Sequence, residues 1–291
     1  MEDSGGVPDG DSLPEPNCAE LSPEVVVISA HGDVVLDVTF QNSKDTIRSA
    51  HKAARARYTS LRNPQPKQPA PKPRVRLAFR VDLTVLKMQS KYFDKLLGDS
   101  HFKEANDIAD AFSALSLTNV SPKDADVKDL PWVKIHDDDE ATSYAYRENV
   151  FADLLRILHG QDVKTSQTQI TMSFMTTLAV LADRFNCAAS VSKYMTTRLK
   201  FKWPATNLRK PPRDDGNGFS TMSRENESVI RQKILVSWLL NQPGKFQAAT
   251  KELIMNGSCR WSSFEEEDET TGATWWYLQD GLERELSFTC P

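Results

Sequence analysis

The residues best suited to chemistry lie at 136–140, where one histidine is followed by four carboxylates. Imidazole and carboxylate groups bind divalent cations, so a metal site is one interpretation of this run. Neighbouring carboxylates on a single turn, however, cannot all face one ion. We therefore interpret the run as a solvated turn ahead of a helix, and we expect no metal ion there.

No other pattern in the sequence predicts catalysis. There is no glycine-rich phosphate loop, nucleophile elbow or His-x-x-x-His motif. The cysteines are widely spaced and match no metal or redox motif, which predicts free thiols in a reducing, intracellular compartment: Cys18, Cys187, Cys259 and Cys290. His159 and Cys187 fall in expected helices, where core or capping roles are commoner than catalysis. The sequence thus predicts no enzyme, no cofactor and no small-molecule substrate.

The stretch 76–97 is the one around which we expect the fold to assemble. Apolar and polar side chains alternate through 77–82, which predicts a strand with one buried face. Apolar residues then recur at helical spacing and predict a helix over 84–97: Leu83, Leu86, Phe93 and Leu97. A strand that leads directly into a short amphipathic helix needs further strands and helices to bury it.

Three further segments have strand-like patterns. Residues 25–29 and 34–40 flank a Gly-Asp turn, so we expect them to form a hairpin. Residues 132–135 form a short later strand. Together with 77–82, they predict a small, mostly antiparallel sheet.

Three later helices are expected at 147–159, 171–185 and 189–200, with Gly160 as the cap that ends the first. Each has an apolar stripe that should face the sheet. We expect six side chains from these helices and from 84–97 to be buried together: Leu86, Phe93, Leu155, Leu158, Leu178 and Leu181.

The composition divides the chain into parts. They are a disordered acidic N-terminus (1–23), an α+β domain (24–204) with insertions at 41–74 and 105–131, a linker (205–228) and a helical C-terminal extension (229–291). The extension contains two amphipathic helices, which we expect to dock on the helices of the domain. An acidic loop (265–269) and an aromatic segment (275–278) follow, and we expect the aromatic segment to pack on the chain's own core.

Charge is strongly segregated along the chain, although its net value is −4. Residues 1–30 carry seven acids and no Lys or Arg, whereas 41–74 carry nine basic residues and one acid, Asp45. In this basic insertion, 50–61 is weakly helical in pattern and 63–74 is rich in proline. A nuclear-localisation or nucleic-acid-binding patch is one interpretation. We favour a flexible, solvated insertion, because basic runs are common and this one lacks interleaved aromatic residues.

The sequence also predicts where the protein resides. Its acidic N-terminus lacks the apolar core of a secretory signal. No apolar run approaches the roughly 20 residues that a membrane span needs. We expect a cytoplasmic or nuclear protein, or one present in both compartments, without a membrane partner.

The stretch 76–97 resembles the core signature of the BTB/POZ domain, in which a strand precedes a Val-Leu pair, a serine, an aromatic pair and a leucine. The matching residues are Val85, Leu86, Ser90, Tyr92, Phe93 and Leu96. Other family-like segments occur in the family's order: an opening strand at 31–40, Phe102-Lys103-Glu104, and helices at 151–160 and 178–186. The resemblance covers about 31–203, and the tail near 275–286 is similar to filamentous-fungal BTB proteins.

This resemblance implies a BTB/POZ fold and a protein–protein interaction adaptor without cofactors. Some relatives dock a cullin scaffold and deliver substrates for ubiquitination, through a hydrophobic-x-acid motif that would fall at Phe102, Lys103 and Glu104. We add Asp33 and Tyr92 as candidate interface residues. The expected partners are other proteins, with a cullin scaffold and self-association as candidates, and nucleic acid is not expected. The alternative hypothesis is a nuclear, nucleic-acid-associated regulatory factor that uses the basic insertion.

Overall fold

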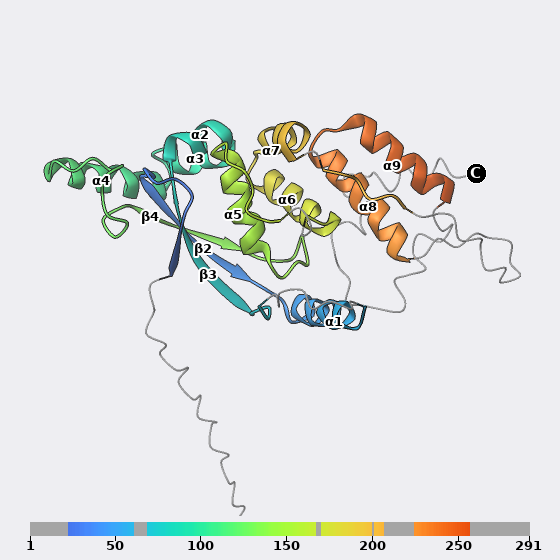
Figure 1. Ribbon diagram of the computed structural model, residues 1–291. Coiled ribbons are helices and arrows are strands. Elements are labelled where there is room, and N and C mark those ends of the chain that lie inside the picture. The colour runs from blue at the N-terminus through green and yellow to red at the C-terminus, as the bar shows by residue number, and fades with distance from the viewer. Residues whose placement is uncertain (1–22, 61–68, 167–169, 200, 207–223, 257–291) are drawn as a thin grey trace, which may run out of the picture.

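The computed structural model describes residues 23–60, 69–166, 170–199, 201–206 and 224–256 (Figure 1). In this part of the chain the fold is α+β, with a small mixed sheet of four strands and nine α-helices. The predictions of a disordered N-terminus, an acidic loop at 265–269 and a docked aromatic segment at 275–278 concern residues outside the described ranges.

The sheet contains β1 (Glu24–Val27), β2 (Val34–Gln41), β3 (Arg74–Val81) and β4 (Trp132–Asp137), in the order β1-β3-β2-β4. β2 and β3 pair antiparallel, as expected for neighbouring strands joined by an insertion. β1 pairs parallel with β3, and β4 pairs parallel with β2. The prediction of a mostly antiparallel sheet is therefore wrong, and so is the prediction of a hairpin between the first two strands.

The turn at Gly32 explains why the hairpin does not form. A Cβ on Gly32 would lie 2.7 Å from the backbone oxygen of Val81, so the chain approaches the end of β3 as closely as only glycine allows. The next residue, Asp33, donates its backbone N–H to the same oxygen at 3.0 Å. The chain thus crosses the end of β3, which places β1 and β2 on opposite sides of that strand.

A serine divides the predicted helix over 84–97 into α2 (Leu83–Gln89) and α3 (Lys91–Gly98). The backbone N–H of Ser90 closes α2 by donating to the Leu86 oxygen at 3.0 Å. Its buried hydroxyl accepts from the Phe93 N–H at 3.1 Å and donates to the Phe185 oxygen at 2.6 Å. Ser90 is therefore the cap that ends one helix and begins the next.

Three helices join α2 and α3 on one face of the sheet: α5 (Arg147–Leu158), α6 (Met172–Arg184) and α7 (Ala188–Tyr194) (Figure 1). A π-helical turn, Met195–Leu199, extends α7. Gly160 follows α5 with a φ of +68°, which confirms its predicted capping role. The six side chains predicted to share a core are all buried in one cluster: Leu86, Phe93, Leu155, Leu158, Leu178 and Leu181.

The other face of the sheet is covered by α4 (Lys103–Leu117) and the segment that leads from it to β4. Leu115, Ala125 and Leu130 pack there against Val35 and Ala78 of the sheet. β2 is accordingly buried on both faces along its first seven residues. The region 105–131, which interrupts the sequence resemblance, thus forms a layer of the fold.

The C-terminal helices α8 (Arg224–Leu239) and α9 (Pro243–Asn256) confirm the predicted docking. α8 packs against α6, and Val236 and Leu240 belong to the main core cluster. A smaller cluster joins the two helices to each other: Ile230, Ile234, Ala249 and Leu253.

The basic insertion begins with a helix, α1 (Lys44–Ser60), which is longer than the weak helix expected over 50–61. α1 starts three residues after the end of β2 and lies apart from the helices that cover the sheet (Figure 1).

Candidate partner-binding surface

Two helices and the turn between them position most of the residues selected from the sequence. α3 is held by Phe93, which is fully buried and stacks on Phe185 with ring centroids 5.4 Å apart. Tyr92 precedes it and is 37% exposed, while its ring meets those of Phe93 and Phe185 edge-on at 5.3 and 5.2 Å. One side of the tyrosine is thus fixed by the core, and the other side faces solvent.

The Phe-x-Glu element forms the first turn of α4. Phe102 occupies the N-cap position, makes no side-chain capping bond and is 41% exposed. Lys103 is exposed and Glu104 is half-buried. Burial, and then the negative charge of Glu104, raise the pKa of the Tyr92 phenol. This effect, together with the packing of α3 on α4, indicates that Tyr92 and Glu104 lie near each other.

Asp33 does not share this surface. Its side chain is buried and accepts the Leu83 backbone N–H at 2.8 Å, at the start of α2. Burial raises the pKa of its carboxyl, and the hydrogen bond from Leu83 only partly offsets that effect. The structure therefore gives Asp33 a role in positioning α2.

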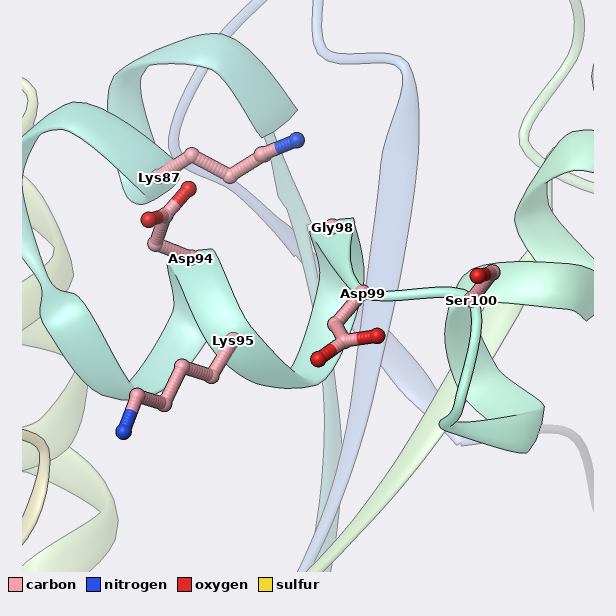
Figure 2. A pocket seen from close by; sticks show the side chains of 6 residues that line it. All are labelled: Lys87, Asp94, Lys95, Gly98, Asp99 and Ser100. Carbon is pink, nitrogen blue, oxygen red and sulfur yellow. The ribbon is translucent and has the colours of Figure 1, made fainter.

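A polar depression of about 450 Å³ lies beside the Phe-x-Glu element (Figure 2). Its lining residues come from α2, α3 and the turn before α4: Lys87, Asp94, Lys95, Gly98, Asp99 and Ser100. Lys87 extends from α2 over Gly98, where a Cβ would lie 2.7 Å from its Nζ atom, whereas Lys95 points away (Figure 2). The charges of its two lysines and two aspartates cancel. The depression therefore offers polar contacts but has no strong preference for cations or anions.

Asp99 and His101 shape the turn that carries Phe102. The Asp99 carboxylate accepts the His101 backbone N–H at 3.0 Å and lies 2.6 Å from Nδ1 of its ring. Both hydrogen bonds lower the pKa of Asp99, and the bond from the backbone N–H has the larger effect. The turn thereby presents Phe102 in a defined direction.

Sequence reasoning did not select Met88, which is 70% exposed on α2. Tyr92 on α3 and Phe102 at the start of α4 are also large exposed apolar side chains, and Leu117 is exposed at the other end of α4. α2 packs on α3, and α3 packs on α4. The exposure of Met88 could have been predicted from the sequence, because this residue lies within the predicted helix but outside its apolar stripe. We name the surface of α2–α4 that carries Met88, Tyr92, Phe102, Lys103 and Glu104 the α2–α4 surface.

The acidic run at 136–140 has a different role from the one predicted. His136, Asp138 and Glu140 are exposed, but Asp137 and Asp139 are buried, so the prediction of a solvated turn is wrong for these two. The described part of the chain holds no cluster of three or more His, Cys, Asp or Glu side chains placed to bind a metal ion.

Arginine side chains neutralise Asp137. One of its carboxylate oxygens accepts from Nε of the fully buried Arg147 at 2.7 Å, and the other accepts from Arg184. Arg147 also donates to the Gln41 oxygen at 2.7 Å and to Oδ1 of Asn42 at 2.8 Å. The acidic run thus joins the ends of β2 and β4 to the start of α5.

Asp139 holds the start of α1. Its carboxylate accepts from the backbone N–H and the hydroxyl of Ser43, at 2.8 and 2.9 Å. Burial alone would raise the pKa of Asp139, but hydrogen bonds from Thr46 and Ser43 outweigh burial and lower it.

His159 and Cys187 serve the fold, as predicted. His159 caps α5: its Nε2 accepts the Asp82 N–H at 3.1 Å, so its Nδ1 carries the proton that it donates to the Leu155 oxygen at 2.7 Å. Burial lowers the pKa of this imidazole and favours its neutral form. Cys187 is buried in the main core, and burial raises the pKa of its thiol to about 12.

No family model, curated protein or solved structure matches this chain. Among the residues that the structure describes, no helix combines the length and the apolar character that crossing a membrane requires. The function of the α2–α4 surface therefore has to be inferred from its own residues.

Proposed function

We propose that this chain is a protein–protein interaction adaptor of the BTB/POZ type, which binds its partner through the α2–α4 surface. The observation that carries the proposal is the exposure of Phe102 at the start of α4, two residues before Glu104 and on a helix that packs against α3, which carries Tyr92. An aromatic side chain held by a rigid element and surrounded by polar groups is typical of the anchors that dominate binding energy. Loss of Phe102 should therefore weaken binding far more than loss of a peripheral side chain.

The order of the elements supports the proposal. β2 and β3 pair antiparallel and lead into α2 and α3, and β4, α5, α6 and α7 follow. Ser90, the serine of the sequence signature, caps α3 and binds the end of α6. The signature serine thus links α3 to the end of α6. Such a structural role is expected if the sequence resemblance reflects a similar fold and not only a similar composition.

As the first partner to test, we propose a cullin-type scaffold of a ubiquitin ligase. The hydrophobic-x-acid order of Phe102, Lys103 and Glu104 supports this choice. The insertion that follows does not block these residues, because α4 turns its apolar stripe to the sheet through Ile108 and Leu115. The outer side of its first turn remains open to a partner.

Calorimetry with the full chain and a purified cullin scaffold tests the proposal. Phe102→Ala should weaken binding at least about tenfold, as expected for an interface anchor. Leu117→Ala is the matched control, because Leu117 lies on the same helix, is 86% exposed and is far from its first turn. Far-UV circular dichroism of both variants should match the parent protein.

A second readout separates the choice of partner from the adaptor role. If the parent chain binds no cullin, its partners can be compared with those of Phe102→Ala by affinity purification and quantitative mass spectrometry. A set of partners that Phe102→Ala depletes and Leu117→Ala retains would support an adaptor with another partner. An identical set for all three proteins would exclude the α2–α4 surface as the binding site.

We propose a nucleic-acid-associated factor as the second candidate function, because α1 exposes several cations. Lys44, Arg48, Lys52 and Arg55 are all exposed. Duplex binding through them should weaken steeply with salt, with a log–log slope near −0.9 per phosphate neutralised. We expect weak and sequence-independent binding, since phosphate contacts carry no base information. Sequence-specific binding at physiological salt would favour this candidate over the adaptor.

A further inference from the structure

The helix α1 carries a basic stripe that the proposed adaptor function does not use. Lys44, Arg48, Lys52 and Arg55 follow one another at i, i+4, i+8 and i+11, and His51 lies among them. At 3.6 residues per turn, these five side chains fall within an arc of about 100° over about 16 Å. All five are exposed. We call them the α1 basic stripe.

The opposite side of α1 faces the protein. Thr46 is buried, and Ile47, Ala50 and Ala54 are partly buried. Ser43 fixes the start of the helix through its two hydrogen bonds to Asp139, and its hydroxyl accepts the Thr46 N–H at 3.2 Å. The α1 basic stripe is therefore held in one orientation, facing away from the body.

One acid lies within the sequence of α1. Asp45 pairs with Arg48 at 3.1 Å, and both side chains are more than half exposed. Solvent screens such a pair strongly, so it leaves most of the positive potential of the stripe in place.

The chain contains a segment of complementary charge, residues 1–22. This segment carries six acids and no Lys or Arg: Glu2, Asp3, Asp9, Asp11, Glu15 and Glu20. Four lysine and arginine side chains along one line suit an extended acidic peptide. Duplex binding through so few phosphate contacts would be sequence-independent and easily lost as salt rises.

The sheet register places the end of this segment near α1. Glu24, at the start of β1, pairs with Leu77 of β3, and Gln41, at the end of β2, pairs with Arg74 of the same strand. These two positions on β3 are three residues apart, or about 10 Å, and β1 and β2 are two strand spacings apart, or about 10 Å. The acidic segment therefore joins the fold about 14 Å from the strand end that leads into α1, on the same end of the sheet.

We infer that the α1 basic stripe is an intramolecular docking surface for the acidic segment 1–22. Tethering at this short range gives the segment a local concentration in the millimolar range, which compensates for weak individual ion pairs. The bound segment covers the stripe and lowers its affinity for other polyanions. Because all the contacts are solvent-exposed ion pairs, the docking weakens as salt rises.

Zero-length carbodiimide cross-linking of the full chain tests where the segment lies. In dilute salt, amide bonds should form between Lys44 or Lys52 and the carboxylates of residues 1–22, and should be lost in 0.5 M NaCl. The internal control is the pair Lys123 and Asp82, whose charged atoms the fold holds 3.8 Å apart. That cross-link should persist in salt.

Competition for a labelled duplex DNA, used only as a polyanion probe, tests the consequence. Replacement of the six acids by their amides, Glu to Gln and Asp to Asn, should raise the affinity of the full chain for the probe at least about fivefold. The double variant Lys52→Glu, Arg55→Glu should abolish this gain. Lys128→Glu, an exposed position between α4 and β4, should leave the gain unchanged.

Several results would overturn the inference. Equal probe affinity with and without the six acids would mean that the stripe is open, and would favour a nucleic-acid role for it. Segment cross-links confined to lysines outside α1 would assign the segment another site. Hybrid cross-links between isotopically labelled and unlabelled chains would assign the occupant to a second copy.

Discussion

At the residue scale, Arg147 is a buried charge with a structural role. In the sequence it is only the first residue of a predicted helix. Its guanidinium is fully buried and binds the Asp137 carboxylate, two backbone oxygens at the strand ends and the Asn42 amide oxygen. A buried charge is tolerated only when its hydrogen bonds are satisfied, and removal of one partner leaves the other uncompensated. Arg147 is therefore a structural centre rather than a binding group.

Arg147→Met should lower the free energy of unfolding by about 3–5 kcal/mol, because it leaves the buried Asp137 with Arg184 as its remaining charged partner. Urea denaturation measures this change. The matched control is Arg48→Met, whose exposed pair with Asp45 should contribute no more than about 1 kcal/mol. Equal effects of the two substitutions would contradict the buried role of Arg147.

Cys187 should be unreactive in the folded protein. Its thiol is buried with a pKa of about 12, so about one molecule in ten thousand carries the reactive thiolate at pH 8. A variant in which Cys18, Cys259 and Cys290 are serine leaves Cys187 as the single thiol. We expect this variant to resist a disulfide reagent at pH 8 and to react within minutes in guanidinium. Rapid reaction of the native form would show that the core opens easily at α7.

At the element scale, Ser90 decides the path of the chain between the sheet and the helices. It satisfies the first turn of α3 and, through the Phe185 oxygen, ties α3 to the end of α6. Tyr92 and Phe93 lie in the first turn of α3, so the cap also orients the ring that packs inward and the ring that reaches the α2–α4 surface. A change at Ser90 should therefore affect both stability and partner binding.

Ser90→Ala should cost about 1–2 kcal/mol of stability, the usual range for loss of a helix N-cap. Ser113→Ala is the control, since Ser113 is exposed within α4 and its hydroxyl only returns to the Ala109 oxygen. We expect that control to change stability by less than about 0.5 kcal/mol. Chemical denaturation of both variants would decide, and a neutral Ser90→Ala would show that water replaces the cap without loss.

The elements also show what sequence patterns can and cannot predict. The spacing of Leu86 and Phe93 is the same in one helix and in two, so periodicity alone could not locate the break at Ser90. Alternation correctly predicted that Phe79 and Val81 face the main core, but not that Ala78 is buried on the other face beneath the segment after α4. Strand pairing depends on distant contacts, and the parallel partner of β1 was missed. Phe102 and Lys103 were selected through the family resemblance, and no helix was predicted to begin there, so their exposure at the start of α4 is a finding of the structure. The burial of Asp33 was not predicted either, because it depends on the Leu83 N–H fifty residues away.

At the scale of the whole molecule, the regions that interrupt or follow the sequence resemblance extend the core. α4 and its following segment cover the second face of the sheet through Leu115, Ala125 and Leu130. α8 adds Val236 and Leu240 to the cluster that also contains Leu178 of α6. One continuous core joins the sheet to the C-terminal helices, which predicts that they unfold together.

Leu240→Ala tests this cooperativity. Leu240 is 1% exposed directly after the end of α8, and its truncation should cost about 2–5 kcal/mol. Native-state hydrogen exchange followed by mass spectrometry can assign the loss to individual elements. If the core unfolds as one unit, the slowest amides of β2 should lose the same protection as those of α8, although β2 lies on the far side of the helical layer.

The control for this measurement is Leu117→Ala, which removes a side chain that is 86% exposed and should leave exchange unchanged throughout. The informative comparison is between β2 and α8 in Leu240→Ala. Protection lost in α8 and α9 alone would mean that the helix pair opens as a separate unit, with its own small core of Ile230, Ile234, Ala249 and Leu253. Equal loss in both elements requires that the contacts of α8 with α6 carry stability to the sheet. That result would make the C-terminal helices part of the scaffold that holds the α2–α4 surface rigid.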